Sequence, residues 1–339
     1  MLDAVVGLLS QDLALDPGSS RLRVHMRNVG LVRDMPALVG IQSVGDRRRW
    51  LAVGDAARRM VGRTAGSVSV VRPFDGGVPR DAEIASALIA TLNREIHGRR
   101  SLVRPRTALA LGGDVDSAGR QAWQSVLIAA GVREVRFVHR SFAAARGADL
   151  DVTSPHAWLV ADVGASGTEL SLLAGGRAVA VRRVAWGGDA ADLAVAERVR
   201  ERHNIELGPA GAEAVKIAAA GWSNASPSTL ARGRCAHRGL PMRAPVTHQD
   251  LAGCLDGGVR LVAASIRRLL EETSGELADD VMERGFVLTG GGAQLRGLDA
   301  ALRIATGIAV VAADQPDRAV VRGVGTALDD GAALRAWAA

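Results

Sequence analysis

Two stretches of this chain share one pattern of apolar and polar positions. Residues 13–15 and 159–161 are apolar, an aspartate closes each run, and a glycine and small residues follow after one spacer. Alternating apolar runs come next, at 21–26 and 168–173. The pattern predicts two β-hairpins, each with a carboxylate at a strand end and a turn whose backbone N–H groups can close on an anion such as phosphate.

A second pair of segments, one in each half of the chain, is also similar in sequence. Leu-Ala-Leu-Gly-Gly at 109–113 is similar to Val-Leu-Thr-Gly-Gly-Gly at 287–292, and both are apolar strands that enter glycines. The chain therefore reads as two related halves whose hairpins face each other across a cleft. Three glycines alone would also fit a tight turn, but beside two phosphate-type hairpins they favour a nucleotide site, where backbone lies flat against a base or phosphate.

Composition adds limits to this picture. A chain of 339 residues that is 48% hydrophobic can form two domains, each with its own core. It contains no apolar run of membrane-spanning length, and the first residues lack the basic region of a signal peptide. Two cysteines fit a reducing cytoplasm. Cys235, His237, His248 and Cys254 match no usual spacing of metal ligands, so we expect no metal site there.

The net charge of +6 does not indicate a nucleic-acid partner. Arginines are interspersed with acidic residues along most segments, a pattern typical of a solvated surface. Four Phe and no Tyr leave few side chains for stacking on bases. We therefore expect no nucleic-acid binding.

Lys216 is the only lysine among 42 basic residues. Residue 215 is valine, so the chain has no Gly-Lys-Ser/Thr phosphate loop. A lysine that survives where arginine replaces all others is either a chance surface residue or a site that needs a compact ammonium. Glu213 stands three positions earlier, on the same face of a predicted helix. A carboxylate and an ammonium together suit a ribose diol and a neighbouring phosphate or ring nitrogen.

Over almost its whole length the chain resembles the MreB-like bacterial actins, cell-shape proteins of the actin-like ATPase superfamily. The motifs that carry the resemblance are Ala-Val-Gly-Asp-Ala at 52–56 with Gly62-Arg63-Thr64, Val71-Arg72-Pro73 with Gly76-Gly77-Val78, Ala143-Ala144-Ala145 with Gly147-Ala148, Asp162-Val163-Gly164 with Thr168-Glu169, Gly187-Gly188-Asp189, and 287–298. The hairpin motif fits any superfamily member. The run at 287–298 and the spacing from Val53-Gly54-Asp55 to Gly62-Arg63-Thr64 are typical of MreB itself.

The resemblance implies an α/β actin-like ATPase fold, with two duplicated halves around a nucleotide cleft and a small subdomain inserted into each. The implied subdomains are 1–29, 64–150 and 318–339 for the large part of the first half, 30–63 for its small part, 151–185 and 250–317 for the large part of the second half, and 186–249 for its small part. The implied cofactors are ATP or ADP and Mg²⁺.

Roles in the site are also implied residue by residue. Asp16 would hold Mg²⁺ through water, and Asp162 would help to order metal-bound water. The phosphate-binding residues would be Gly18, Ser19 and Ser20 on one side, and Gly164, Ser166, Gly167 and Thr168 on the other. Glu213 and Lys216 would take the ribose, and Gly290, Gly291 and Gly292 would face the adenosine.

Three departures from the family pattern bear on catalysis. Where the family has Glu-Glu-Pro, this chain has His139-Arg140-Ser141, and one of those glutamates is implied to position the attacking water. Two alternatives stay open: an imidazole, that of His139, acts in its place, or hydrolysis is lost. Pro17 removes a backbone N–H from the first loop, and Ala165 replaces a glycine of the second. We expect nucleotide binding to survive these changes better than turnover, so a slow ATPase coupled to polymerisation is expected, with impaired hydrolysis as the alternative.

Two segments are candidate membrane anchors. Leu2, Val5, Val6 and Leu9 form one helical stripe without basic residues, whereas residues 99–106 place Leu102 and Val103 among four arginines. Basic residues are attracted to an anionic leaflet, which favours the second segment. A solvated connector leading into the next strand is the alternative.

Three functions remain open. The first is an ATP-binding filament that is cytoplasmic, peripheral on the inner membrane face, and directs cell-wall synthesis and cell shape, with itself, the membrane and the wall-synthesis machinery as partners. The second is a nucleotide-binding relative with weak or lost hydrolysis that acts as a filament partner. The third is a chaperone-type ATPase or a small-molecule kinase, for which we find neither a peptide-binding domain nor a catalytic base.

Overall fold

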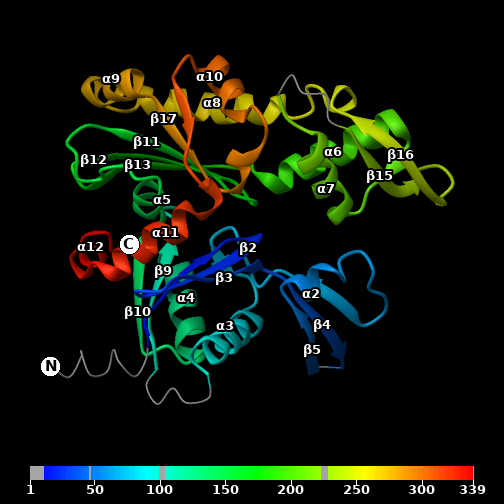
Figure 1. Ribbon diagram of the computed structural model, residues 1–339, viewed down its shortest axis with the longest axis horizontal. Helices are drawn as coiled ribbons and strands as arrows, with labels where there is room; N and C mark the ends of the chain where they lie inside the picture. The colour runs from blue at the N-terminus through cyan, green and yellow to red at the C-terminus, as the bar shows by residue number, and fades with distance from the viewer. Residues whose placement is uncertain (1–10, 46, 99–103, 223–227, 339) are drawn as a thin grey trace. The chain divides into compact units, whose positions relative to one another are not determined.

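A computed structural model describes residues 11–45, 47–98, 104–222 and 228–338 (Figure 1). The chain forms two compact units: unit 1 comprises Met1–Pro155, Leu173–Val181 and Arg318–Ala339, and unit 2 comprises His156–Leu172 and Arg182–Asp317. The predicted N-terminal stripe, and residues 99–103 of the arginine-rich segment, lie outside the described residues. Among the helices of the described part, none is long and apolar enough to cross a membrane.

Unit 1 is built on a five-stranded sheet with the order β10-β9-β1-β2-β3. Its strands are β1 (Leu13–Pro17), β2 (Arg21–Met26), β3 (Gly30–Pro36), β9 (Arg106–Leu111) and β10 (Glu134–His139). β1 pairs antiparallel with β2 and parallel with β9, and β9 pairs parallel with β10. The predicted hairpin of the first half is therefore present at the centre of this sheet.

Side-chain alternation gives the sheet two different faces. Leu13 and Leu15 of β1 belong to the apolar core that includes α3 (Ala82–His97) and α4 (Ser117–Ala129). Ala14 and Asp16 share the opposite face, where α5 (Arg140–Gly147) and α11 (Ala319–Asp329) contact the sheet. The aspartate that ends β1 is thus directed to the layer formed by α5 and α11.

α5 and α11 lie against each other with their backbones in contact (Figure 1). A Cβ atom on Gly147 would lie 1.7 Å from the carbonyl oxygen of Ala319, and one on Gly323 would lie 1.9 Å from that of Ala143. Only glycine fits at such distances. The Gly-Val-Gly sequence at 323–325 is therefore a helix-packing motif in unit 1.

A second five-stranded sheet has the order β13-β12-β11-β17-β18, which repeats the plan of the first sheet. Its strands are β11 (Trp158–Val163), β12 (Thr168–Ala174), β13 (Arg177–Val184), β17 (Phe286–Thr289) and β18 (Val310–Ala312). Strands β11, β17 and β18 belong to unit 2, whereas Leu173–Val181, at the end of β12 and the start of β13, is assigned to unit 1. In each sheet the first strand is central, the next two follow on one side, and two later parallel strands lie on the other. β9 and β17, which carry the second sequence echo, occupy equivalent places. The predicted duplication is confirmed.

Smaller elements complete both units. In unit 1 these are β4 (Val39–Val44), β5 (Arg47–Val53) and β6 (Val68–Val71), which form one sheet, together with β7 (Phe74–Asp75), β8 (Val78–Pro79), α2 (Asp55–Arg58) and α12 (Gly331–Ala336). In unit 2 a small sheet consists of β14 (Ile205–Glu206), β15 (Ser228–Cys235) and β16 (Pro241–Thr247). The helices of unit 2 are α6 (Gly188–His203), α7 (Pro209–Ala219), α8 (Asp256–Glu271), α9 (Gly275–Arg284) and α10 (Leu298–Thr306), with short 3-10 helices at Gln249–Leu251 and Gly291–Gln294.

The structure adds detail to the subdomain prediction without testing its boundaries. β3 pairs with β2 in the large sheet, and the first small sheet begins at Val39. It also continues to Val71, where β6 pairs with β4. The four predicted subdomains stay a prediction.

Candidate functional site

The turn between β11 and β12 is held in place by the start of α6. The N–H of Gly164 donates to the carbonyl of Gly167 at 2.9 Å and closes the turn. The carbonyls of Gly164 and Ala165 accept from the N–H groups of Gly188 and Asp189, both at 2.9 Å. In a trans peptide the N–H points opposite to the C=O. The N–H groups that follow these two carbonyls, those of residues 165 and 166, therefore point away from α6.

Close backbone packing supports this turn from behind. A Cβ atom on Gly187 would lie 2.6 Å from the carbonyl oxygen of Gly164, so only glycine fits there. Thr168 is fully buried, and its hydroxyl donates to the carbonyl of Trp186 at 2.7 Å. The Ser166 hydroxyl accepts from the Arg183 guanidinium at 2.9 Å. Of the predicted phosphate residues, Thr168 thus uses its side chain to brace the hairpin.

Lys216 is joined to the same turn through α6. Its ammonium donates to the carbonyl of Gly188 at 3.0 Å and pairs with Asp192 at 2.8 Å, and its side chain is only 11% exposed. Gly188 in turn donates to Gly164. The sequence predicted a ribose contact for Lys216, which stays a prediction. The structure gives Lys216 a positioning role, because it bonds to the first turn of α6, which in turn bonds to the loop at 164–167.

The ionised form of Asp192 is stabilised by Lys216. Burial raises the pKa of Asp192 above its ordinary value of 3.8, and Lys216 opposes that shift. The negative charges of Glu213 and Asp189 raise the pKa of Asp192 further. The Lys216 ammonium therefore stabilises the ionised form of Asp192, which two further carboxylates, Asp189 of α6 and Glu213 of α7, disfavour.

The triple glycine has two packing positions and one open position. A Cβ atom on Gly290 would lie 2.4 Å from the carbonyl oxygen of Val163, and one on Gly292 would lie 2.3 Å from a Val163 methyl carbon. A Cβ atom on Gly291 would meet nothing within 4 Å. Asp162, at the end of β11, accepts a hydrogen bond from the Thr289 hydroxyl at 3.3 Å. Of the three glycines, Gly291 is the one whose surroundings leave space for a ligand.

In unit 1 the turn after β1 is braced in a comparable way. A Cβ atom on Gly18 would lie 2.8 Å from the carbonyl oxygen of Arg21. The Ser19 hydroxyl accepts from the N–H of Gly76 at 3.2 Å, and the carbonyl of Ser20 accepts from the N–H of Ala37 at 2.9 Å. The predicted loop 18–20 is therefore fixed by neighbours from two later segments.

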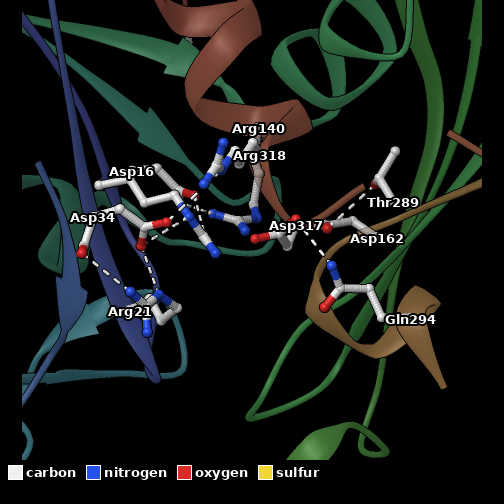
Figure 2. Close-up of polar contacts among 10 residues, drawn as sticks. Asp16, Arg21, Asp34, Arg140, Asp162, Thr289, Gln294, Asp317 and Arg318 are labelled. Atoms are coloured by element: carbon white, nitrogen blue, oxygen red, sulfur yellow. Dashed lines mark hydrogen bonds and ion pairs between the residues drawn. The ribbon is translucent and has the colours of Figure 1, made fainter. Parts of the chain in front are cut away.

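The carboxylate of Asp16 faces arginine side chains (Figure 2). One carboxylate oxygen accepts from Arg140 at 2.8 Å, and the other lies 3.9 Å from the Arg23 guanidinium. Asp16 is 2% exposed. Asp34 lies beside it and pairs with Arg21 at 2.5 Å and with Arg23 at 3.3 Å. Arg318 lies 3.8 Å from Asp34. We call these six side chains the arginine cluster.

His139 does not take part in the arginine cluster. Its ring lies edge-on to Phe142 with the ring centroids 6.1 Å apart, and the backbone N–H of His139 donates to the carbonyl of Trp337. Within the described part of the chain, its Nδ1 atom has no hydrogen-bond partner. Burial lowers the pKa of His139, and the positive charge of Arg120 lowers it further, so both effects favour the neutral imidazole.

The sequence reasoning missed four members of the cluster, because Arg21 of β2 was also not singled out. The other three, Arg23, Asp34 and Arg318, lie in β2, in β3 and just before α11, and none of the four belongs to a motif. Alternation along β2 and β3 could have placed Arg23 and Asp34 on one face, since these residues are direct partners in the antiparallel register. Nothing in the sequence indicated Arg318.

The two cysteines have different surroundings. Burial raises the pKa of the Cys254 thiol to about 11. The Cys235 sulfur accepts a weak hydrogen bond from Asn204 at 3.5 Å. No group of three or more potential metal-binding side chains was found in the part of the chain that the structure describes.

The fold is the α/β actin-like ATPase fold. MreB5 of Spiroplasma citri bound to ADP matches with a TM-score of 0.90 and 25% identity, over 96% of this chain and 98% of that chain. The MamK double helical filament, at 21% identity, shares the fold with a TM-score of 0.78 over 95% of this chain and 99% of that chain.

The sequence comparison narrows this class to one family. The sequence model of the family described as MreB/Mbl protein matches residues 10–336. The cell shape-determining protein MreB of Escherichia coli (strain K12) is 32% identical over 335 residues, which cover 97% of this chain and 96% of that protein. The cell shape-determining protein Mbl of Bacillus subtilis (strain 168) is 28% identical over 325 residues, 95% of this chain and 97% of that one. The chain belongs to the MreB/Mbl family.

Proposed function

We propose that this chain binds ATP or ADP and assembles with copies of itself into filaments that determine cell shape. Full-length similarity to cell shape-determining proteins supports this, as does the 0.90 TM-score to a relative bound to ADP. The observation that carries the nucleotide assignment is the turn at 164–167, because its tethered carbonyls direct successive N–H groups outward. Such an arrangement suits an anionic phosphate.

The residues that would hold the nucleotide follow from this proposal. The backbone of Ala165, Ser166 and Gly167 would contact phosphate in unit 2, and Gly291 has the open space that a flat ligand needs. Lys216 would act through Gly188 on the loop. Magnesium held by Asp16 does not fit as well, because Arg140 already donates to that carboxylate.

Placement at the inner face of the cytoplasmic membrane, with the wall-synthesis machinery as a partner, is the finer part of the proposal. It rests on the arginine-rich segment 99–106. Of the two arginines there that the structure describes, Arg104 is exposed and Arg106 pairs with Asp12 at 2.8 Å. Arg104 is therefore the better placed of the two to meet an anionic leaflet.

A filament partner with weak or lost hydrolysis is the second candidate. Arg140 replaces a carboxylate of the family pattern and bonds to Asp16, while His139 packs against Phe142. Pelleting with ATP, with ADP and without nucleotide, combined with phosphate release, separates the two. Nucleotide-dependent pelleting with phosphate release supports an ATPase filament, and pelleting without release supports the second candidate. If neither nucleotide binds, the proposal fails.

Replacing Lys216 with alanine should weaken ADP binding by about 1–3 kcal/mol, the scale of a charge-assisted hydrogen bond with its partner left unpaired. The loss arises because Gly188, which holds the Gly164 carbonyl, is no longer supported. Calorimetry measures the effect. Arg200→Ala, which removes an exposed ion pair with Glu197 on α6, is the matched control and should leave the affinity unchanged.

The stability of Lys216→Ala should also depend on pH. Without the ammonium, the raised pKa of Asp192 rises further, and a raised carboxyl pKa costs stability as pH increases. The penalty is absent below the ordinary value of 3.8 and complete above the folded-state pKa. Denaturation should therefore show a larger difference from wild type at pH 7 than at about pH 4. A difference that is independent of pH would contradict this account.

A further inference from the structure

The arginine cluster carries more positive than negative charge. It holds the guanidinium groups of Arg21, Arg23, Arg140 and Arg318, and the carboxylates of Asp16 and Asp34. Four positive and two negative charges leave a net charge of +2 among these six side chains. Arginine side chains stay protonated in proteins.

A divalent cation does not fit beside Asp16. Magnesium demands near-octahedral oxygen coordination and usually binds through one or two carboxylates that can reach it or its water shell. The carboxylate of Asp16 is 2% exposed, and its oxygens already face Arg140 at 2.8 Å and Arg23 at 3.9 Å. A cation there would have to displace a guanidinium and would meet the repulsion of those that remain.

The same excess charge suits phosphate. Guanidinium groups bind phosphate oxygens with paired N–H donors and are more weakly hydrated than an ammonium. In Figure 2 the labelled side chains of Arg140 and Arg318 extend toward Asp16 and Asp34 from the beginnings of α5 and α11. A glutamate at residue 140, as in the family pattern, would instead place a second carboxylate near Asp16 and would favour a cation.

We propose that the arginine cluster replaces the divalent cation in unit 1, so that the chain binds nucleotide phosphates without magnesium. Arg140 is the residue that changes the site, because it converts a carboxylate position into a guanidinium bonded to Asp16. This inference rests on the proposed binding of nucleotide. It goes beyond it by assigning a metal-independent mode of phosphate recognition to named residues of this chain.

The test compares ADP affinity in excess MgCl₂ with that in EDTA. The wild-type affinities should differ by less than about fivefold, because the guanidinium groups supply the positive charge. Arg140→Glu should bind at least about fivefold more tightly with magnesium than in EDTA, since the variant adds a carboxylate beside Asp16. Arg146→Glu makes the same charge change at an exposed position of α5 and is the matched control, which should behave as wild type.

Each outcome is informative. A wild-type affinity that falls by fivefold or more in EDTA overturns the inference while nucleotide binding stands, and absence of ADP binding in both conditions overturns the proposed function. Arg140→Gln covers the case in which Arg140→Glu does not fold, because it removes only the charge. It should bind ADP in EDTA about tenfold more weakly than wild type, the loss expected for one charge-assisted contact. An unchanged affinity for this variant would remove Arg140 from the site.

Discussion

Replacing Asp16 with alanine should lower the free energy of unfolding by about 3 kcal/mol or more, the cost of removing one partner of a buried ion pair. The side chain is 2% exposed and bonds to Arg140 at 2.8 Å. Without it, the guanidinium groups of Arg140 and Arg23 lose their shared carboxylate. Arg23 retains Asp34 at 3.3 Å, which limits the loss. Chemical denaturation of the whole chain measures the change.

The control for Asp16→Ala is a pair with similar chemistry at the surface. Glu134→Ala removes an exposed pair with Arg136 at 2.6 Å in the same unit and should cost less than about 1 kcal/mol. Equal effects of the two substitutions would mean that Asp16 contributes no more than a surface carboxylate. In that case the arginine cluster would not be an organised site.

Replacing Gly323 with alanine should destabilise the chain by about 3 kcal/mol, at the upper end of what overpacking costs. The added Cβ would lie 1.9 Å from the Ala143 carbonyl oxygen, and a backbone atom cannot move aside as a flexible side chain can. Alanine favours a helix by about 1 kcal/mol over glycine, so the clash must exceed that gain for the predicted sign to hold. Thermal unfolding measures the result.

Gly331→Ala is the matched control for this substitution. Gly331 begins α12, and its added Cβ would meet nothing closer than the Arg335 guanidinium at 3.7 Å. We expect it to be neutral or slightly stabilising. Because α5 begins at Arg140 and α11 follows Arg318, separating these helices should also disturb the arginine cluster. A stable Gly323→Ala variant would show that the two helices can move apart at little cost.

Local pattern determined the duplicated framework of this protein. Apolar runs ending in Asp16 and Asp162 predicted two hairpins, and the similar strands entering Gly112 and Gly290 predicted that the chain has two related halves. Both predictions are confirmed because strand alternation and glycine turns depend on neighbouring residues. Glu213 and Lys216 lie on one helix, as predicted, whereas the role of Lys216 in nucleotide binding stays a prediction.

Tertiary structure alone decided what these residues contact. Lys216 bonds to Gly188 and Asp192, which lie 28 and 24 positions away in the chain. Arg140 reaches Asp16 across 124 positions, because the backbone-to-backbone crossing of α5 and α11 brings the start of α5 over that face of the sheet. Composition and spacing show which charged residues the chain has, but which of them pair depends on how the sheets and helices pack. The sequence therefore determined the fold and the family, whereas only the packed structure revealed an arginine at the carboxylate expected to hold a metal.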